Sequence, residues 1–170
     1  MAFFGCERLA DKNGFLIVRS ILFNFLHDVS EIAVPEGVSR IGDFAFYRNH
    51  NLKKVTLPDS VKSIGVGAFE ECENLAQIDM PENPIMIEDR TFRGCRCFAD
   101  DRGFIILRGI LYDCFIAEEH VEIPLGVTRI GSWAFLHKEN LISVTVQDGL
   151  KEIANDAFRD CPKLTHISRR

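Results

Sequence analysis

Three cysteines and one histidine in this sequence lie close enough together to suggest a metal site. Cys95 and Cys97 are separated by one residue, and Cys114 and His120 follow further along the chain. Thiolate and imidazole groups bind Zn²⁺, but zinc sites normally pair their cysteines as C-x₂₋₄-C and add a matching second pair. Cys95 also occupies a position that recurs as cysteine along the chain, which is typical of a small packing residue. We therefore expect no metal and no cofactor.

Catalytic groups are equally hard to assemble. Cys114 and His120 resemble a nucleophile and its base, but no third group is in place to orient the histidine. The acidic pairs Glu70-Glu71, Asp100-Asp101 and Glu118-Glu119 fall in predicted loops, where solvated surface is the expected role. The sequence also lacks a P-loop, a dinucleotide-binding glycine pattern, HExxH and GxSxG. We expect no enzyme activity.

Composition excludes several other classes of protein. The chain has 170 residues, 25 acidic and 20 basic, with a formal net charge of −5. Nucleic-acid binders usually carry a basic excess, so no nucleic-acid partner is expected. No apolar run approaches the roughly 18 residues that cross a bilayer, so no membrane insertion is expected. The first residues do not resemble a secretory leader, and on that ground a cytoplasmic location remains open.

An Ala-Phe pair recurs along the chain and sets a repeat. The pairs begin at Ala2, Ala45, Ala68, Ala134 and Ala157, and Thr91-Phe92 fills the same position. Their successive spacings are 43, 23, 23, 43 and 23 residues. The period is therefore 23 residues, with about 20 residues inserted twice. Such a period is the signature of stacked repeats.

A second level of repetition is longer. A shift of 89 residues aligns residues 1–81 with 90–170 without a gap, and 31 of these 81 pairs are identical. The inserts align as well. The chain is therefore a tandem duplication of a block of three repeats.

The cleanest repeat, Leu52–Asn74, shows what each unit contains. Alternation over Val55–Leu57 predicts a short, half-buried strand, which Pro58 ends. Val61–Ile64 predicts a second extended segment. Ala68–Cys72 has helical spacing and predicts a single helical or 3₁₀ turn.

Stacking of these units predicts the fold, because 23 residues cannot bury their apolar side alone. We expect an α/β repeat solenoid of short parallel strands in one domain, residues 1–170. Its units are about 9–51, 52–74, 75–97, 98–140 and 141–163, with partial units at both ends. One internal column should hold Phe3, Phe46, Phe69, Phe92, Phe135 and Phe158.

The pattern Val-x-Leu-Pro-x-x-Val-x-x-Ile-Gly-x-x-Ala-Phe-x-x-Cys-x-x-Leu resembles the BspA-like leucine-rich repeats across essentially the whole chain. The resemblance implies a right-handed leucine-rich-repeat solenoid. It also implies a non-catalytic surface or secreted protein that binds other macromolecules or mediates adhesion. The competing interpretation is a structural spacer within a larger surface protein.

Two departures from repeat patterns carry expectations. The position where general leucine-rich repeats place a laddering Asn or Cys holds Gly37, Ser60, Asn83, Gly126 and Gly149. The turn backbone must therefore find other partners. The cysteine position becomes Asn49 and Lys138 in the two repeats with inserts, and we expect a less tightly packed closing turn there.

Each insert resembles the hairpin-like insert of the same family. Phe15–Val18 and Ile21–Phe23 flank Arg19-Ser20, and the same arrangement recurs around Arg108-Gly109. Both strands are apolar on both faces. The outer face is either covered by other insert residues or forms an adhesive patch.

Strand alternation identifies the polar positions on the concave face. This candidate binding face consists of Glu31, Lys54, Thr56, Gln77, Asp79, His120, Glu122, Ser143 and Thr145. It has no aromatic residue and no basic stripe. The alternatives are a generic polar sheet face and a shallow surface for a protein or glycan ligand.

The ends of the chain raise the question of self-association. Phe3 and Phe4 lie at one end and Leu164 and Ile167 at the other, and none resembles the polar cap that solenoids need. We expect the ends to be covered by further repeats or by a partner copy. A homo-oligomer through these ends or through the apolar hairpins is possible.

Overall fold

The computed structural model describes residues 7–83 and 85–170, so the predictions for Ala2, Phe3 and Phe4 lie outside the described residues. The chain forms two compact units, Met1–Phe98 and Ala99–Arg170. Their boundary lies within one residue of the predicted junction between the third and fourth repeats. A single domain over residues 1–170 stays a prediction, and the units are described separately.

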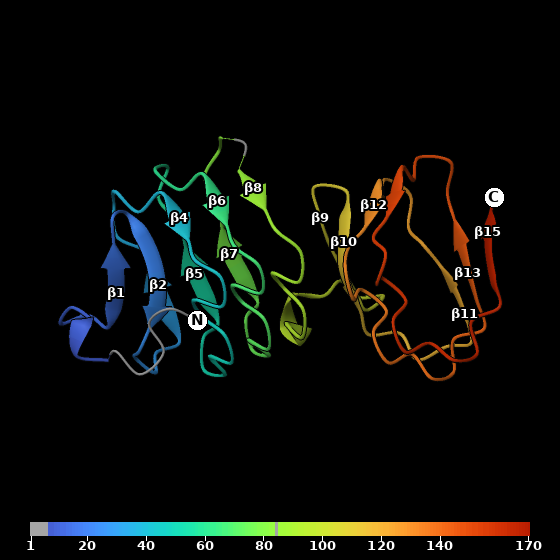
Figure 1. Ribbon diagram of the computed structural model, residues 1–170, viewed down its shortest axis with the longest axis horizontal. Coiled ribbons are helices and arrows are strands. Elements are labelled where there is room, and N and C mark those ends of the chain that lie inside the picture. Colours follow the sequence, from blue (N-terminus) through green and yellow to red (C-terminus); the bar gives the residue numbers. More distant parts are fainter. Residues whose placement is uncertain (1–6, 84) are drawn as a thin grey trace. The chain divides into compact units, whose positions relative to one another are not determined.

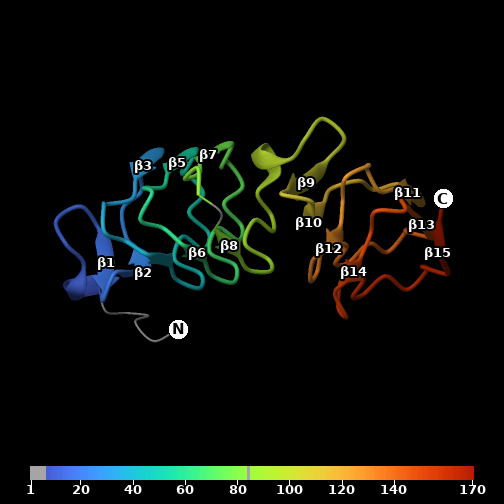
Figure 2. The same cartoon turned by 90° about the horizontal axis from the view of Figure 1, so that it is seen from above.

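The first unit contains two sheets on opposite sides, with loops between them (Figures 1 and 2). One sheet has the strand order β3-β5-β7 and the other the order β1-β2-β4-β6-β8. The elements are η1 (Glu7–Leu9), β1 (Phe15–Val18), β2 (Ile21–Phe25), β3 (Glu31–Ala33), β4 (Arg40–Ile41), β5 (Lys54–Thr56), β6 (Ser63–Ile64), β7 (Gln77–Asp79), β8 (Met86–Ile87) and η2 (Arg96–Phe98).

The second unit repeats this plan with sheets β11-β13-β15 and β14-β12-β10-β9. Its strands are β9 (Phe104–Leu107), β10 (Ile110–Cys114), β11 (His120–Glu122), β12 (Arg129–Ile130), β13 (Ser143–Val146), β14 (Glu152–Ile153) and β15 (His166–Arg169). Within each unit the predicted repeat solenoid is confirmed.

The 23-residue period becomes the register of the parallel strands. Lys54 lies opposite Gln77, and Ser63 opposite Met86. Apolar positions of successive repeats therefore stack on each other between the two sheets. In the Leu52–Asn74 repeat these positions are almost fully buried: Leu52, Val55, Leu57, Val61, Ile64, Ala68, Phe69 and Cys72.

The phenylalanine column is confirmed inside each unit. Phe69 is fully buried, and its ring centroid lies 5.0 Å from that of Phe46 and 5.9 Å from that of Phe92. The planes are within 8° and 4° of parallel. In the second unit Phe135 and Phe158 stack at 4.9 Å.

The Ala-Phe segments, for which the spacing predicts a single helical or 3₁₀ turn, are successive β-turns. In the 46–49 turn the Asn49 N–H donates to the Phe46 carbonyl, three residues back. Residues with positive φ stand on both sides of Ala-Phe, including Phe44 (58°) and Arg48 (59°), and they interrupt any helix. The extra backbone donors then point to the next repeat, as in the Phe46 N–H to Ala68 carbonyl bond of 2.8 Å. At the position of the missing asparagine ladder, the Ser60 hydroxyl instead accepts the Gly37 N–H at 3.1 Å and donates to the Val38 carbonyl at 2.9 Å.

The repeated cysteines add a side-chain bond between repeats. The Cys72 thiol donates to the Phe46 carbonyl at 2.9 Å, and the Cys95 thiol to the Phe69 carbonyl at 3.0 Å. Both are fully buried, whereas Cys161 in the last turn is half-buried. Burial raises the pKa of Cys72 to about 12 and that of Cys114 to about 11, so both stay protonated. The five described cysteines are free thiols.

Both predicted hairpins are present. Val18 pairs with Ile21 across Arg19-Ser20, whose φ angles of 49° and 62° fit a type I′ turn. The second hairpin strand, β2, pairs in parallel with β4 and takes the place of a preceding repeat. In β1 Phe15 and Leu16 are buried, and Val18, at 38% exposure, is the exposed large apolar residue. The burial in this hairpin therefore favours an outer face covered by other residues over an exposed adhesive patch.

Candidate functional site

The predicted binding residues of the first unit lie on the outer face of β3-β5-β7. Parallel pairing aligns them in two rows, Glu31-Lys54-Gln77 and Ala33-Thr56-Asp79. The strands alternate, so Val55 points into the core while Lys54 and Thr56 point outward. The result is two parallel rows of mainly polar side chains on the outer face of the sheet.

Asp79 is the centre of this face. Its carboxylate accepts hydrogen bonds from the Gln77 amide at 2.6 Å and from the Thr56 hydroxyl at 3.2 Å, and it pairs with the Lys54 ammonium at 3.0 Å. The Gln77 hydrogen bond, followed by the Lys54 bond, lowers the pKa of Asp79 below its usual value. The group is therefore a fixed anion, suited to recognition by charge and hydrogen bonding rather than to proton transfer.

The second unit presents the remaining predicted residues on β11-β13-β15. The His120 Nδ1 lies 2.8 Å from the Ser143 hydroxyl, and the Thr145 hydroxyl lies 3.4 Å from that of Ser168. Glu122 accepts a hydrogen bond from Gln147 at 2.9 Å.

Arg170 completes the second face from outside the predicted set. Its guanidinium pairs with the Glu122 carboxylate at 2.6 Å. Five of the nine predicted residues therefore belong to one polar face and four to the other, each on its own unit. The two faces are separate candidate surfaces.

The cysteines and acidic residues considered as metal ligands or catalytic groups lie in the core, on the surface or in loops. Cys95 and Cys114 are buried and Cys97 is exposed. Across residues 7–83 and 85–170, no group of three or more His, Cys, Asp or Glu is placed to hold a metal ion. The Asp100 carboxylate accepts the backbone N–H groups of Arg102 and Phe104, which fixes the loop before the second hairpin.

The prediction that the Glu70-Glu71 pair is solvated surface is wrong for Glu70, which lies in a charged cluster on the turns. Glu70 is 3% exposed, and its carboxylate binds Arg90 at 2.8 and 3.0 Å and Arg93 at 2.7 Å. Arg93 also reaches Glu71 at 3.0 Å. Glu70 and Arg93 are one 23-residue period apart, so the repeat itself could have predicted that they face each other.

Aromatic rings with arginine partners occur on the same turns. The Arg90 guanidinium lies 5.6 Å from the Phe44 ring centroid, and Arg159 lies 5.7 Å from that of Trp133. Phe44 and Trp133 are equivalent under the 89-residue duplication. Aromatic and arginine residues dominate many interfaces, and here they lie on the turns, away from the polar faces.

The repeat pattern and the solenoid now have counterparts among known proteins. Residues 2–100 and 105–169 match the family described as BspA type leucine rich repeat region, in six copies. The chain therefore belongs to the BspA-type leucine-rich repeat family. Such repeat proteins are commonly protein-binding or surface-associated, and the fold is generally non-enzymatic.

Similar solved structures are leucine-rich repeat proteins. One from Bacteroides ovatus has 29% identity and a TM-score of 0.53, over 84% of this chain and 38% of that one. The T. pallidum leucine rich repeat protein has 27% identity and a TM-score of 0.49, over 86% of this chain and 62% of that one. A leucine rich cell surface protein from Faecalibacterium prausnitzii has 27% identity and a TM-score of 0.47, over 88% and 35%.

This chain spans less than two thirds of the length of each of these proteins. No curated protein matches it. The part of the chain that the structure describes holds no helix with the length and hydrophobicity that a membrane crossing requires.

Proposed function

We propose that this chain is a non-catalytic binding module whose two polar faces recognise a protein partner at a cell surface. The observation that supports it most directly is the fixed array around Asp79, where three side chains from two strands hold one carboxylate in place. Ordering these side chains before binding lowers the entropic cost of association. Membership of a commonly surface-associated family supports the location.

A protein partner fits the faces better than a small ligand. The outward residues are polar and lie in rows along the paired strands. An extended polar surface suits another folded surface, since small ligands prefer enclosed sites. Glu31 and Asp79 outnumber Lys54 on the first face, so a partner patch with basic residues is the complementary surface.

The test reverses the central charge pair of the first face. Surface proteins of the source cells are cross-linked to the immobilised chain, and the affinity of each captured protein is then measured after purification. The variant Lys54→Glu/Asp79→Lys should lower the affinity for a true partner at least tenfold. The control Asp59→Lys/Lys62→Glu makes the same exchange of charges at two exposed positions outside the strands and should leave affinity unchanged.

The spacer interpretation makes the opposite prediction. A spacer has no saturable partner, or its apparent partners bind the face variant and the control equally. Either result would remove the binding role from the first face, and Ser143→Arg would then test the second face alone.

A further inference from the structure

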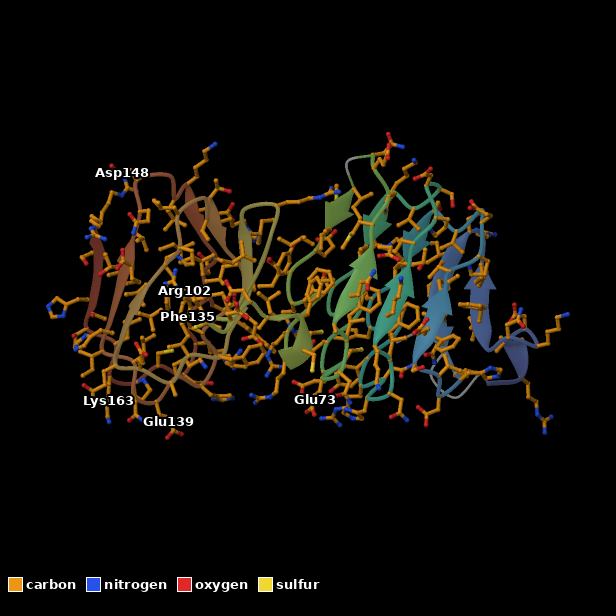
Figure 3. All side chains as sticks on the ribbon, turned by 180° about the vertical axis from the view of Figure 1, so that it is seen from behind. Glu73, Arg102, Phe135, Glu139, Asp148 and Lys163 are labelled. Atoms are coloured by element: carbon orange, nitrogen blue, oxygen red, sulfur yellow. The ribbon has the colours of Figure 1, made fainter. Side chains whose placement is uncertain are left out.

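The insert-bearing repeat of each unit has a hollow beside its closing turn. In the first unit the hollow measures about 320 Å³ and lies between the end of β2 and the turn that follows Phe46. A hollow of about 250 Å³ occupies the equivalent place in the second unit. Figure 3 shows Glu139, from the second hollow, at the margin formed by the closing turns, with Asp148 at the opposite margin.

The hollows arise where the sequence predicts looser packing. Elsewhere a cysteine thiol bonds the closing turn to the Phe carbonyl of the preceding repeat. Asn49 takes this position in the first unit, and its amide donates to the His27 carbonyl at a long 3.5 Å. The Asn49 Oδ1 atom is buried and has no hydrogen-bond partner in the protein. An unsatisfied buried acceptor is uncommon in proteins and calls for a donor.

The lining of the first hollow combines aromatic and polar groups. Tyr47 is 38% exposed. Its ring packs edge-to-face with Phe44, with the two ring centroids 5.8 Å apart, and the Arg48 guanidinium lies 5.1 Å from the Tyr47 ring centroid. The Asp28 carboxylate is fixed by a 2.7 Å bond from the Asn51 amide. Side chains held in this way are available to a ligand at little entropic cost.

From this geometry we propose that the first hollow binds a neutral sugar residue. Each sugar hydroxyl both donates and accepts a hydrogen bond, and the lining offers acceptors from Asp28 and donors from Arg48 and the amides. Tyr47 supplies an aromatic surface for the C–H side of a sugar ring. One carboxylate and one guanidinium balance each other, which disfavours a strongly charged ligand. The hollow is shallow, because most of its lining side chains are exposed, and its volume of about 320 Å³ leaves room for a single sugar ring.

The duplication supplies an internal comparison. Positions equivalent to His27, Asp28 and Tyr47 in the second unit are Ile116, Ala117 and Leu136. The same turn folds around this different lining, so the fold does not require the polar and aromatic groups of the first unit. These polar and aromatic side chains are therefore available for binding a ligand. The second hollow has no tyrosine, phenylalanine or tryptophan in its lining and should not bind sugar.

The test uses the whole chain and defined probes. Backbone amide shifts are followed by NMR during titration with methyl β-D-glucopyranoside, methyl β-D-galactopyranoside and N-acetylglucosamine, and separately with inorganic phosphate. We expect saturable shifts at residues 26–28 and 46–51 for at least one sugar, with a Kd on the order of 1 mM. Residues 116–118 and 137–141 should not respond.

Variants decide whether the hollow is responsible. Tyr47→Leu/Asp28→Ala installs the residues of the second unit and should reduce affinity at least tenfold, with an unchanged unfolding midpoint. Glu118→Ala in the second hollow is the control and should bind like the wild type. The proposal is overturned if no sugar gives saturable shifts, if phosphate alone gives them, or if the double variant binds normally. These readouts do not involve the polar faces, so they stand or fall independently of the protein partner.

Discussion

Truncation of Phe69 is the sharpest test of how the solenoid is held together. The side chain is fully buried and stacks between Phe46 and Phe92, at centroid distances of 5.0 and 5.9 Å. Phe69→Ala removes the ring from its contacts with both neighbours and leaves a cavity between them. Large-to-small changes at such sites cost about 3–5 kcal/mol, and two stacked contacts place Phe69 near the upper end.

Phe158 provides the matched comparison. It occupies the same repeat position in the second unit, where it stacks on Phe135 at 4.9 Å but is half-buried. Because part of this ring is already in water, Phe158→Ala should cost only about 2 kcal/mol. The same ring is removed in both variants, so the difference between their losses in free energy of unfolding reports mainly the difference in burial.

Urea unfolding gives both values. Far-ultraviolet circular dichroism reports strand content throughout, and Trp133, the sole tryptophan, reports the second unit. The predicted single domain requires the two signals of Phe69→Ala to shift together. A Phe69→Ala protein that unfolds at the wild-type midpoint, or one less affected than Phe158→Ala, would refute the stacked column as the source of stability.

Four further predictions concern buried groups and close backbone contacts. Cys97 should react quickly with iodoacetamide in the native protein while Cys72 and Cys95 resist, as mass spectrometry before and after denaturation will show; rapid labelling of Cys72 would contradict its burial. Because the Cys72 pKa is raised to about 12 in the folded state, its contribution to stability is complete below about pH 9 and is lost as pH rises towards 12; a Cys72→Ala variant should show a flatter decline in urea midpoint over that range. Glu70→Gln should lower the free energy of unfolding by about 2–3 kcal/mol, since Arg90 and Arg93 lose a buried carboxylate, and an unchanged thermal midpoint would count against this. Gly65→Ala should cost about 1–3 kcal/mol because its Cβ would lie 2.8 Å from the Asp43 backbone nitrogen, whereas Gly149→Ala, with open space around it, should be nearly neutral.

The repeat period made the register predictable. Parallel strands one repeat apart must place residues 23 positions apart side by side, which explains why Lys54 lies opposite Gln77 and why the Thr56 hydroxyl reaches Asp79. The hairpins were equally accessible, because apolar strands around Arg19-Ser20 and Arg108-Gly109 leave few alternatives.

The turn conformation was not predictable from spacing. Apolar residues at i, i+3 and i+4 indicate a helix, yet Phe44 and Trp133 adopt φ angles of 58° and 66°. Bonds to the neighbouring repeat stabilise this left-handed backbone, and a single repeat read alone gives no sign of them. The residues of the candidate face occupy β3, β5 and β7 in one unit and β11 and β13 in the other, and their role in binding stays a prediction. Alternation within a strand says nothing about which strands share a unit.

The spacing of the bonds between repeats has a consequence for how mutations combine. Side-chain partners are separated by about one period, as in the 23 residues between Asp28 and Asn51 and the 26 between Phe69 and Cys95. Energetic coupling between these hydrogen-bonded side chains in double-mutant cycles should therefore peak at separations near 23 residues. A pairwise mutational scan of this protein would show stripes parallel to its diagonal, and the two hairpins would appear as the places where each stripe is displaced.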